Sequence, residues 1–298
     1  MSTLLAVLVD GIIYASWLFV IAAGLTIIYG VMRILNMAHG SLYALGAYLA
    51  ASMAGAWLRG GHPPLGSYAV LVLAAVTVGL VLGPLLERGL LRFCYGKDEV
   101  VLVLVTYALF LMLEDVVKLV WGVEAYFVSE PYGLLGNVEL GPLSYPVYSG
   151  AMVVTAVLVG VALRWGIYGT RYGKLLLAVI HDREVSAALG INVSRIFLVT
   201  FTLGTMLAAI GGALTAPTVS VVPGMGVEVI VLAFAVVVIG GLGSMPGAAI
   251  GALIVGVVRS AAVHWLPQVE LFSIYVVMAL VLIFRPRGLF VAVEARKI

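Results

Sequence analysis

Apolar runs of about 20 residues, separated by short polar stretches, recur along the whole chain. A helix of that length crosses the hydrocarbon core of a bilayer, which is about 30 Å thick. The runs predict helices at residues 11–32, 38–58, 67–86, 100–121, 146–163, 196–217, 227–239, 247–263 and 272–284. We therefore expect an all-α polytopic membrane protein with about eight or nine transmembrane helices.

The stretch 236–256, VVVIGGLGSMPGAAIGALIVG, interrupts this pattern. Glycine breaks a helix easily and proline is tolerated in the first turn of a new one. The stretch therefore predicts two helices that meet at a break formed by Gly240, Gly241, Gly243 and Ser244. The second helix carries small residues at four-residue spacing, which allow close helix packing: Gly243, Gly247 and Gly251. Two interpretations stay open, either tight packing alone or a break whose backbone lines a transport pathway.

Composition agrees with a membrane protein. Of the 298 residues, 63% are hydrophobic and 10% are charged, whereas ordinary soluble domains carry about 25% charged residues. This excludes a soluble domain, and we expect a single transmembrane domain over residues 1–298. No Lys or Arg precedes the first apolar run, so we interpret that run as a retained span and not as a secretory signal. The only cysteine, Cys94, excludes an internal disulfide and a cysteine-based metal site.

The basic residues indicate the orientation, because cytoplasmic loops of membrane proteins are enriched in Lys and Arg. With the N-terminus outside and the C-terminus in the cytoplasm, 13 of the 16 basic residues fall inside. The others are Arg59, Lys118 and Arg259. This distribution requires two opposed crossings within 227–263, so the charges support the break independently.

The predicted outer loop, residues 122–145, has the opposite character. It contains three acidic residues and no Lys or Arg: Glu124, Glu130 and Glu139. Several turn-forming residues suggest short interfacial helices or strands. The loop either contacts an external partner or simply links two spans.

Polar residues gather between the first two predicted helices, where Arg33, Asn36, His39 and Ser41 lie within nine residues. An ionisable group in the bilayer centre costs about 2.5–3.5 kcal/mol, so such groups usually face protein, water or an interface. We interpret Asn36, His39, Gly40 and Ser41 as a polar end that faces a pathway. The alternative is that they satisfy freed backbone at the inner interface. No second His or Cys lies near His39, so a metal site is not expected there.

The inner segment 168–191 is the longest polar insertion on the basic side and has helical periodicity. Leu176, Val179 and Ile180 fall on one face, and Gly190 is a helix stop signal. A short amphipathic helix of this kind either docks into a groove of a cytoplasmic protein or lies on the membrane with its polar face solvated.

Two carboxylates, Glu114 and Asp115, lie in the fourth predicted helix, with Lys118 one turn further along. An intrahelical ion pair with Lys118 would lower the cost of placing them in the membrane. The alternative is a role at the outer mouth, where they would meet the charged groups of an amino acid.

Four motifs, in the same order, resemble the permease subunits of branched-chain amino acid ABC importers. They are NMAHG at 36–40 with GAY at 46–48, a spaced pattern within 168–191, GGLGSMPGAAIGAL at 240–253, and RPRGLF at 285–290. The resemblance extends from residue 24 to residue 290 and is strongest for the shorter of the two homologous permeases. Two positions depart from the family: Leu232 stands where a Lys is common, and Val291 stands where the closing motif usually has Gly. The first departure removes support for a gate or substrate role at residue 232.

The resemblance implies a cell-membrane permease that translocates branched-chain or similar small apolar amino acids by alternating access. It implies four partners: a homologous second permease, two cytoplasmic ABC ATPases and an extracytoplasmic substrate-binding protein. Segment 168–191 would then be the coupling segment that docks on the ATPase, through residues matched to the family or adjacent to them: Gly169, Arg171, Lys174, Asp182, Ala187 and Gly190. Similar permeases carry urea, amides and other small solutes, so the sequence leaves the substrate open.

The chain has no Gly-x4-Gly-Lys-Ser/Thr loop, so ATP hydrolysis is expected in separate subunits. No loop places a nucleophile near a base, so we do not expect an enzyme. We also expect no cofactor, no metal ion and no nucleic-acid partner. The alternative function is a secondary transporter or channel for a small polar solute that works without an ATPase. Such a protein needs an ion-coordinating residue in mid-span, for which Glu114 and Asp115 are the only candidates identified.

Overall fold

Eight helices within the described residues, 2–290, are long and apolar enough to cross a membrane in this computed structural model. They are α1 (Ser2–Met32), α2 (His39–Arg59), α3 (Gly66–Gly89), α4 (Glu99–Trp121), α6 (Val147–Gly169), α9 (Val193–Thr215), α11 (Met245–Trp265) and α12 (Glu270–Phe284) with the 3-10 turn before it (Pro267–Val269). A further apolar helix, α10 (Met225–Gly240), is shorter. The expected all-α polytopic architecture is confirmed. Val291, Arg296 and Lys297 lie outside the described residues.

The helix boundaries differ most from the prediction at the start of α1, which begins nine residues early. Asp10 lies inside the helix, and its carboxylate is 3.4 Å from His264 Nε2 on α11. Burial, together with the nearby Asp10 carboxylate, raises the pKa of Tyr145 to about 12. Asp10 is thus an acidic residue with a basic neighbour, His264, inside the first helix.

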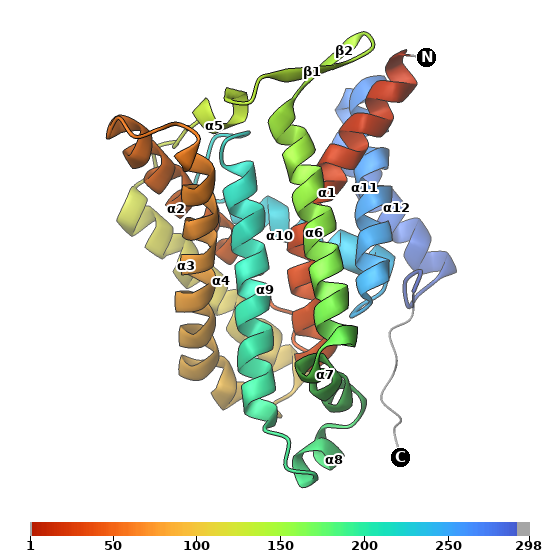
Figure 1. The fold of residues 1–298 in the computed structure, drawn as a ribbon. Helices are drawn as coiled ribbons and strands as arrows, with labels where there is room; N and C mark the ends of the chain where they lie inside the picture. The colour runs from red at the N-terminus through yellow and green to blue at the C-terminus, as the bar shows by residue number, and fades with distance from the viewer. Residues whose placement is uncertain (1, 291–298) are drawn as a thin grey trace.

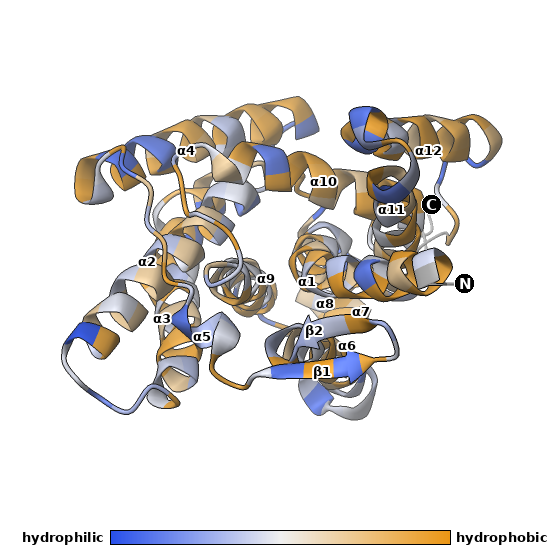
Figure 2. Ribbon diagram, turned by 90° about the horizontal axis from the view of Figure 1, so that it is seen from above, coloured by the Kyte–Doolittle hydropathy of each residue, from blue (hydrophilic) through white to orange (hydrophobic). Residues whose placement is uncertain are grey.

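Helices α1 and α9 lie side by side in the middle of the bundle (Figures 1 and 2). On the far side of α9 are α2 and α3, and against α1 pack α11, α10 and α6. Helices α4, α6 and α12 are peripheral and expose broad apolar faces. These faces are suited to lipid or to another membrane subunit.

The connections between the helices gather at two opposite ends (Figure 1). One, which we call the hairpin end, carries the N-terminus, α5 (Glu130–Gly133) and an antiparallel hairpin of β1 (Asn137–Leu140) and β2 (Leu143–Pro146). The other, which we call the α7 end, carries α7 (Arg171–His181), α8 (Arg183–Ala188) and the short 3-10 turn Leu91–Cys94. Loop 122–145 therefore contains short elements, and 168–191 contains amphipathic helix, as expected.

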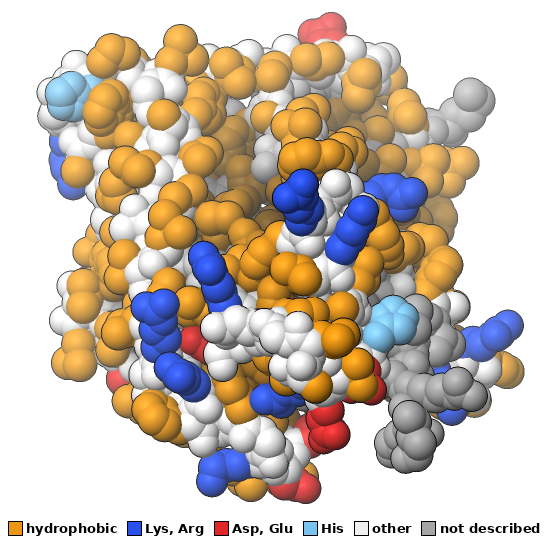
Figure 3. Space-filling model, turned by 60° about the horizontal axis from the view of Figure 1, so that its bottom comes forward, with side chains coloured by type: hydrophobic (Ala, Val, Ile, Leu, Met, Phe, Trp, Pro, Cys, Tyr) orange, Lys and Arg blue, Asp and Glu red, His pale blue; other side chains and the backbone are white. Residues whose placement is uncertain are grey.

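Basic side chains concentrate at the α7 end. Figure 3 shows Lys and Arg side chains spread over this face, around α7 and α8. The fold thus brings together the basic loops that the sequence analysis assigned to one side of the membrane.

Small residues allow α11 to pack closely on two helices. A Cβ atom at Gly247 would meet the backbone oxygen of Gly240 on α10, and one at Gly256 would meet the backbone oxygen of Gly11 on α1. In lipid, helix association depends on such van der Waals contact because lipid tails are as apolar as the side chains. The predicted small-residue face therefore packs α11 on α10, and Gly256 packs the same helix on α1.

We predict that Gly247→Ala lowers the free energy of unfolding by about 1–3 kcal/mol, because the added methyl group forces the α10 and α11 backbones apart. The measurement is thermal unfolding of the detergent-purified protein. Gly150→Ala in α6 is the matched control, since a Cβ there has no atom within 4 Å, and it should be neutral or stabilising by about 0.5–1 kcal/mol. Equal stability of the two variants would contradict the packing.

Candidate functional site

The predicted break separates α10 from α11. Gly241 and Gly243 have φ angles of 106° and 79°, a region that residues with a side chain rarely adopt. The Ser244 hydroxyl caps α11 by accepting a 3.2 Å hydrogen bond from the backbone N–H of Gly247. Gly240 and Gly241 are buried and Ser244 is half-buried. The break therefore lies within protein, where irregular backbone is tolerated in a membrane.

The closing motif RPRGLF, residues 285–290, forms backbone hydrogen bonds with the end of α10 at this break. The backbone N–H groups of Leu289 and Phe290 donate 2.9 Å hydrogen bonds to the carbonyls of Ile239 and Gly240, the last two residues of α10. A helix end leaves such carbonyls without partners in its own helix. The position of the motif could not be predicted from the sequence, because each of these bonds joins residues 50 positions apart in the chain.

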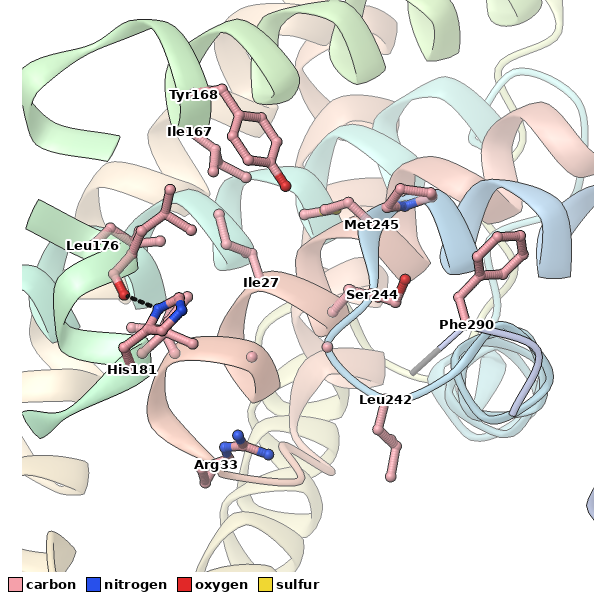
Figure 4. A pocket seen from close by; sticks show the side chains of 17 residues that line it. Ile27, Arg33, Ile167, Tyr168, Leu176, His181, Leu242, Ser244, Met245 and Phe290 are labelled. Carbon is pink, nitrogen blue, oxygen red and sulfur yellow. Dashed lines mark hydrogen bonds between the residues drawn. The ribbon is translucent and has the colours of Figure 1, made fainter. Parts of the chain in front are cut away.

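A pocket of about 350 Å³ lies at the α7 end between this break, the last turns of α1, and α7 (Figure 4). Ser244, Arg33 and His181 line it from these three elements. At its edge α1 and the break approach closely, since a Cβ at Gly30 would lie 3.5 Å from the Cα of Gly243. The structure thus brings two of the predicted break residues, Gly243 and Ser244, beside segment 168–191.

Side-chain caps fix the two helices of segment 168–191. Thr170 caps α7 by accepting a 3.0 Å hydrogen bond from the Gly173 N–H, and Asp182 caps α8 by accepting one of 2.9 Å from the Val185 N–H. Gly190, with a φ of 84°, ends the segment. Sequence analysis identified Asp182 and Gly190 but missed Thr170 and the buried Gly173.

The outward face of this segment carries most of the predicted coupling residues. Leu176 and Val179 are buried against the bundle, while Asp182 is half-buried in its capping position. The other predicted coupling residues are exposed: Gly169, Arg171, Lys174, Ala187 and Gly190. They are accessible to a partner at the end of the molecule.

The second predicted cluster lies deep in the bundle. Arg33, with a φ of 56°, ends α1, and the chain then returns into the protein. His39 Nε2 lies 3.0 Å from the carbonyl oxygen of Ile21, which is about 16 Å along the α1 axis from Met32. Helix α2 therefore begins near the middle of the bundle and not at its inner surface.

Asn36, His39, Gly40 and Ser41 are buried, whereas Arg33 is exposed. Ser41 donates a 3.0 Å hydrogen bond to the Phe110 carbonyl, and a Cβ at Gly40 would meet the Gly226 backbone of α10. Both amide atoms of Asn36 and Nδ1 of His39 lack a hydrogen-bond partner among the described residues. A buried polar group without a partner costs about 1–3 kcal/mol, so these groups do not stabilise the conformation seen here.

Glu114 and Asp115 have different environments although they are adjacent in α4. Lys118 Nζ pairs at 3.2 Å with Asp115, and both side chains are exposed. Glu114 is buried, and its Oε2 accepts a 3.0 Å hydrogen bond from the N–H of Gly224, directly before α10. A carboxylate is favourable at a helix N-terminus. The predicted ion pair with Lys118 is therefore formed by Asp115 and not by Glu114. Glu114 instead holds the backbone at the start of α10.

Sequence analysis missed a group of charged residues toward the hairpin end. Glu228, in the first turn of α10, is exposed and has no hydrogen-bond or ion-pair partner within the described part of the chain. Arg259 on α11 pairs with Glu270 at the start of α12, and its guanidinium carbon lies 4.0 Å from the ring centroid of Tyr14. The available signal was a single acidic residue in the apolar run GVEVIVLAF.

No group of three or more His, Cys, Asp or Glu side chains that could hold a metal ion occurs within residues 2–290. The site thus consists of helix breaks, small residues and isolated polar groups.

Comparison with known proteins gives consistent matches over nearly the whole chain. The family model described as the permease component of branched-chain amino acid transport systems matches residues 7–284. The high-affinity branched-chain amino acid transport system permease protein BraD of Pseudomonas aeruginosa is 29% identical, over 98% of this chain and 97% of that protein. LivH of Escherichia coli K12, described in the same words, is 26% identical over 97% and 96%. A probable LivH permease of Methanocaldococcus jannaschii is 28% identical over 87% and 81%.

We predict that Glu114→Ala lowers the free energy of unfolding by about 1–3 kcal/mol, because the Gly224 N–H loses its acceptor. Glu114→Gln keeps an acceptor oxygen and should retain most of the stability. Asp115→Ala is the matched control, since it removes only an exposed ion pair worth about 0–1 kcal/mol. Thermal unfolding in detergent measures all three variants, and equal losses for Glu114→Ala and Asp115→Ala would contradict the assignment.

Proposed function

The chain belongs to the family of permease components of branched-chain amino acid transport systems, and from this we propose that it moves branched-chain or similar small apolar amino acids by alternating access. It is a multi-pass protein of the cell inner membrane and a transport component, not an enzyme. In this proposal two separate ABC ATPases supply the energy, since the chain has no phosphate-binding loop of its own. The observation that carries the proposal is the family match over residues 7–284.

The ATPases would dock at the α7 end, which we propose to be cytoplasmic. Two apolar side chains, Val185 and Leu189, are 54% and 77% exposed at the tip formed by α8 and the residue after it. This tip lies at the end of the molecule, beyond the long helices (Figure 1). Exposed apolar residues beside charged ones are typical of a surface that another protein covers. Arg171 and Lys174 would supply basic contacts on the same segment.

The pocket at the α7 end suggests how ATPase movement would reach the pathway. It is bounded by α7, the end of α1 and the α10–α11 break. A displacement of α7 would therefore change the shape of the pocket that Gly243 and Ser244 also line. Movement of packed elements that have two discrete arrangements is a common basis for such coupling.

The remaining partners follow from the same proposal. The hairpin end would face outward and meet the substrate-binding protein, with Glu130 and Glu139 on its surface. A homologous second permease would cover one of the exposed helix faces and complete the passage. Asn36, His39, Gly40 and Ser41 would belong to the part of the bundle that rearranges, since they are closed off in this conformation.

We predict that Leu189→Glu combined with Val185→Glu reduces copurification of the ATPases at least tenfold, because the carboxylates must be desolvated at the contact. Val138→Glu is the matched control, since Val138 is 49% exposed but lies in the hairpin at the opposite end. The assay is pull-down of the ATPase subunits from membranes that co-express the transporter. Full ATPase binding by the double variant, or its loss in the control, would remove the docking assignment.

A further inference from the structure

Glu228 is an exposed acidic residue in the first turn of the otherwise apolar helix α10. It lies 12 residues before Gly240, about 18 Å along the α10 axis from the break. Its α10 neighbours Val227 and Val231 are 49% and 39% exposed, so this surface is covered by lipid, water or another chain. A carboxylate at the centre of a bilayer costs about 2.5–3.5 kcal/mol in lipid. Glu228 therefore marks a surface that faces water or protein.

Arg259 lies at a similar depth on the antiparallel helix. It is 14 residues after Met245, about 21 Å along α11 from the same break. Its side chain is 26% exposed and pairs with Glu270. Nε of the guanidinium lacks a hydrogen-bond partner among the described residues. Because α10 ends and α11 begins at this break, Glu228 and Arg259 place opposite charges at similar distances from it.

Tyr14 on α1 interacts electrostatically with both charged residues, Glu228 and Arg259. Its hydroxyl lies within electrostatic reach of Arg259, Glu228 and Glu270, and the Arg259 guanidinium lies over its ring. Trp17 contacts the Tyr14 ring edge-on with centroids 4.9 Å apart, and both rings are half-buried. A cation, an anion and an accessible aromatic surface thus occur together on helices α1, α10 and α11.

We propose that Arg259 and Glu228 bind the two charged groups of a zwitterionic amino acid in transit. Arg259 binds the α-carboxylate, for which a planar guanidinium is well suited. Glu228 binds the α-ammonium group, and the aliphatic side chain lies against Tyr14 and Trp17. Because Arg259 is already paired with Glu270, the carboxylate is held weakly enough to leave again. This inference rests on the proposed function and assigns residues to its pathway.

The test uses the complete transporter in proteoliposomes, with both permeases, the ATPases and the binding protein, and measures ATP-driven uptake of L-leucine. Glu228→Gln is the primary variant because Glu228 has no hydrogen-bond or ion-pair partner among residues 2–290 whose loss would affect folding. We expect at least tenfold slower uptake for Glu228→Gln and Arg259→Gln, and partial recovery in Arg259→Lys. Asp115→Asn and Lys118→Gln, which remove an exposed acid and an exposed base on the peripheral helix α4, should leave uptake unchanged.

Two other outcomes are distinguishable. If Glu228 is an ion-pair partner of the second permease, Glu228→Gln will release that subunit on size-exclusion chromatography, which overturns the inference. Wild-type uptake that persists unchanged in an intact Glu228→Gln complex also overturns it while leaving the proposed function in place. Absence of amino-acid uptake by the wild-type complex would instead refute the proposed function itself.

Discussion

The requirement that backbone polar groups find partners without water determines how this bundle is connected. Each helix interruption leaves N–H or C=O groups free, and in a bilayer an unsatisfied group costs several kcal/mol. The carbonyls at the end of α10 accept from Leu289 and Phe290. In the loop before α2, Thr106 of α4 accepts from the Met37 N–H and donates to the Leu35 carbonyl. Glu114 accepts from Gly224 before α10. At each break, hydrogen bonds thus join the free backbone groups to residues that are distant in the sequence. We call these contacts the junctions of the fold.

These junctions place the elements that a transporter has to move beside one another. Close glycine contacts hold α11 between α10 and α1, so the break emerges next to the end of α1 and α7. The pocket there lies at the end that we propose to be cytoplasmic. Toward the hairpin end, the same α10–α11 pair carries Glu228 and Arg259. One helical hairpin therefore connects the proposed docking region with the proposed solute contacts.

Periodicity and charge were sufficient to predict the helices, the break and the amphipathic segment, because each depends on residues close in sequence. Gly241, Gly243 and Ser244 form the break as the local pattern indicated. The positions that depend on distant contacts could not be predicted. The start of α2 in mid-bundle depends on His39 meeting Ile21, and the environment of Glu114 depends on Gly224, 110 residues away. A role for Glu228 could not be predicted, because a single acidic residue in an apolar helix indicates a functional site only once its exposure is known.

We propose that this chain is the membrane part of an ATP-driven importer and moves no solute alone. The most direct test is uptake of radiolabelled L-leucine into proteoliposomes that contain the purified chain with its second permease, with and without the ATPases, and with the binding protein outside. Uptake should require both the ATPase subunits and ATP on their side of the membrane. Sustained accumulation without the ATPases, driven by an ion gradient, would contradict the claim.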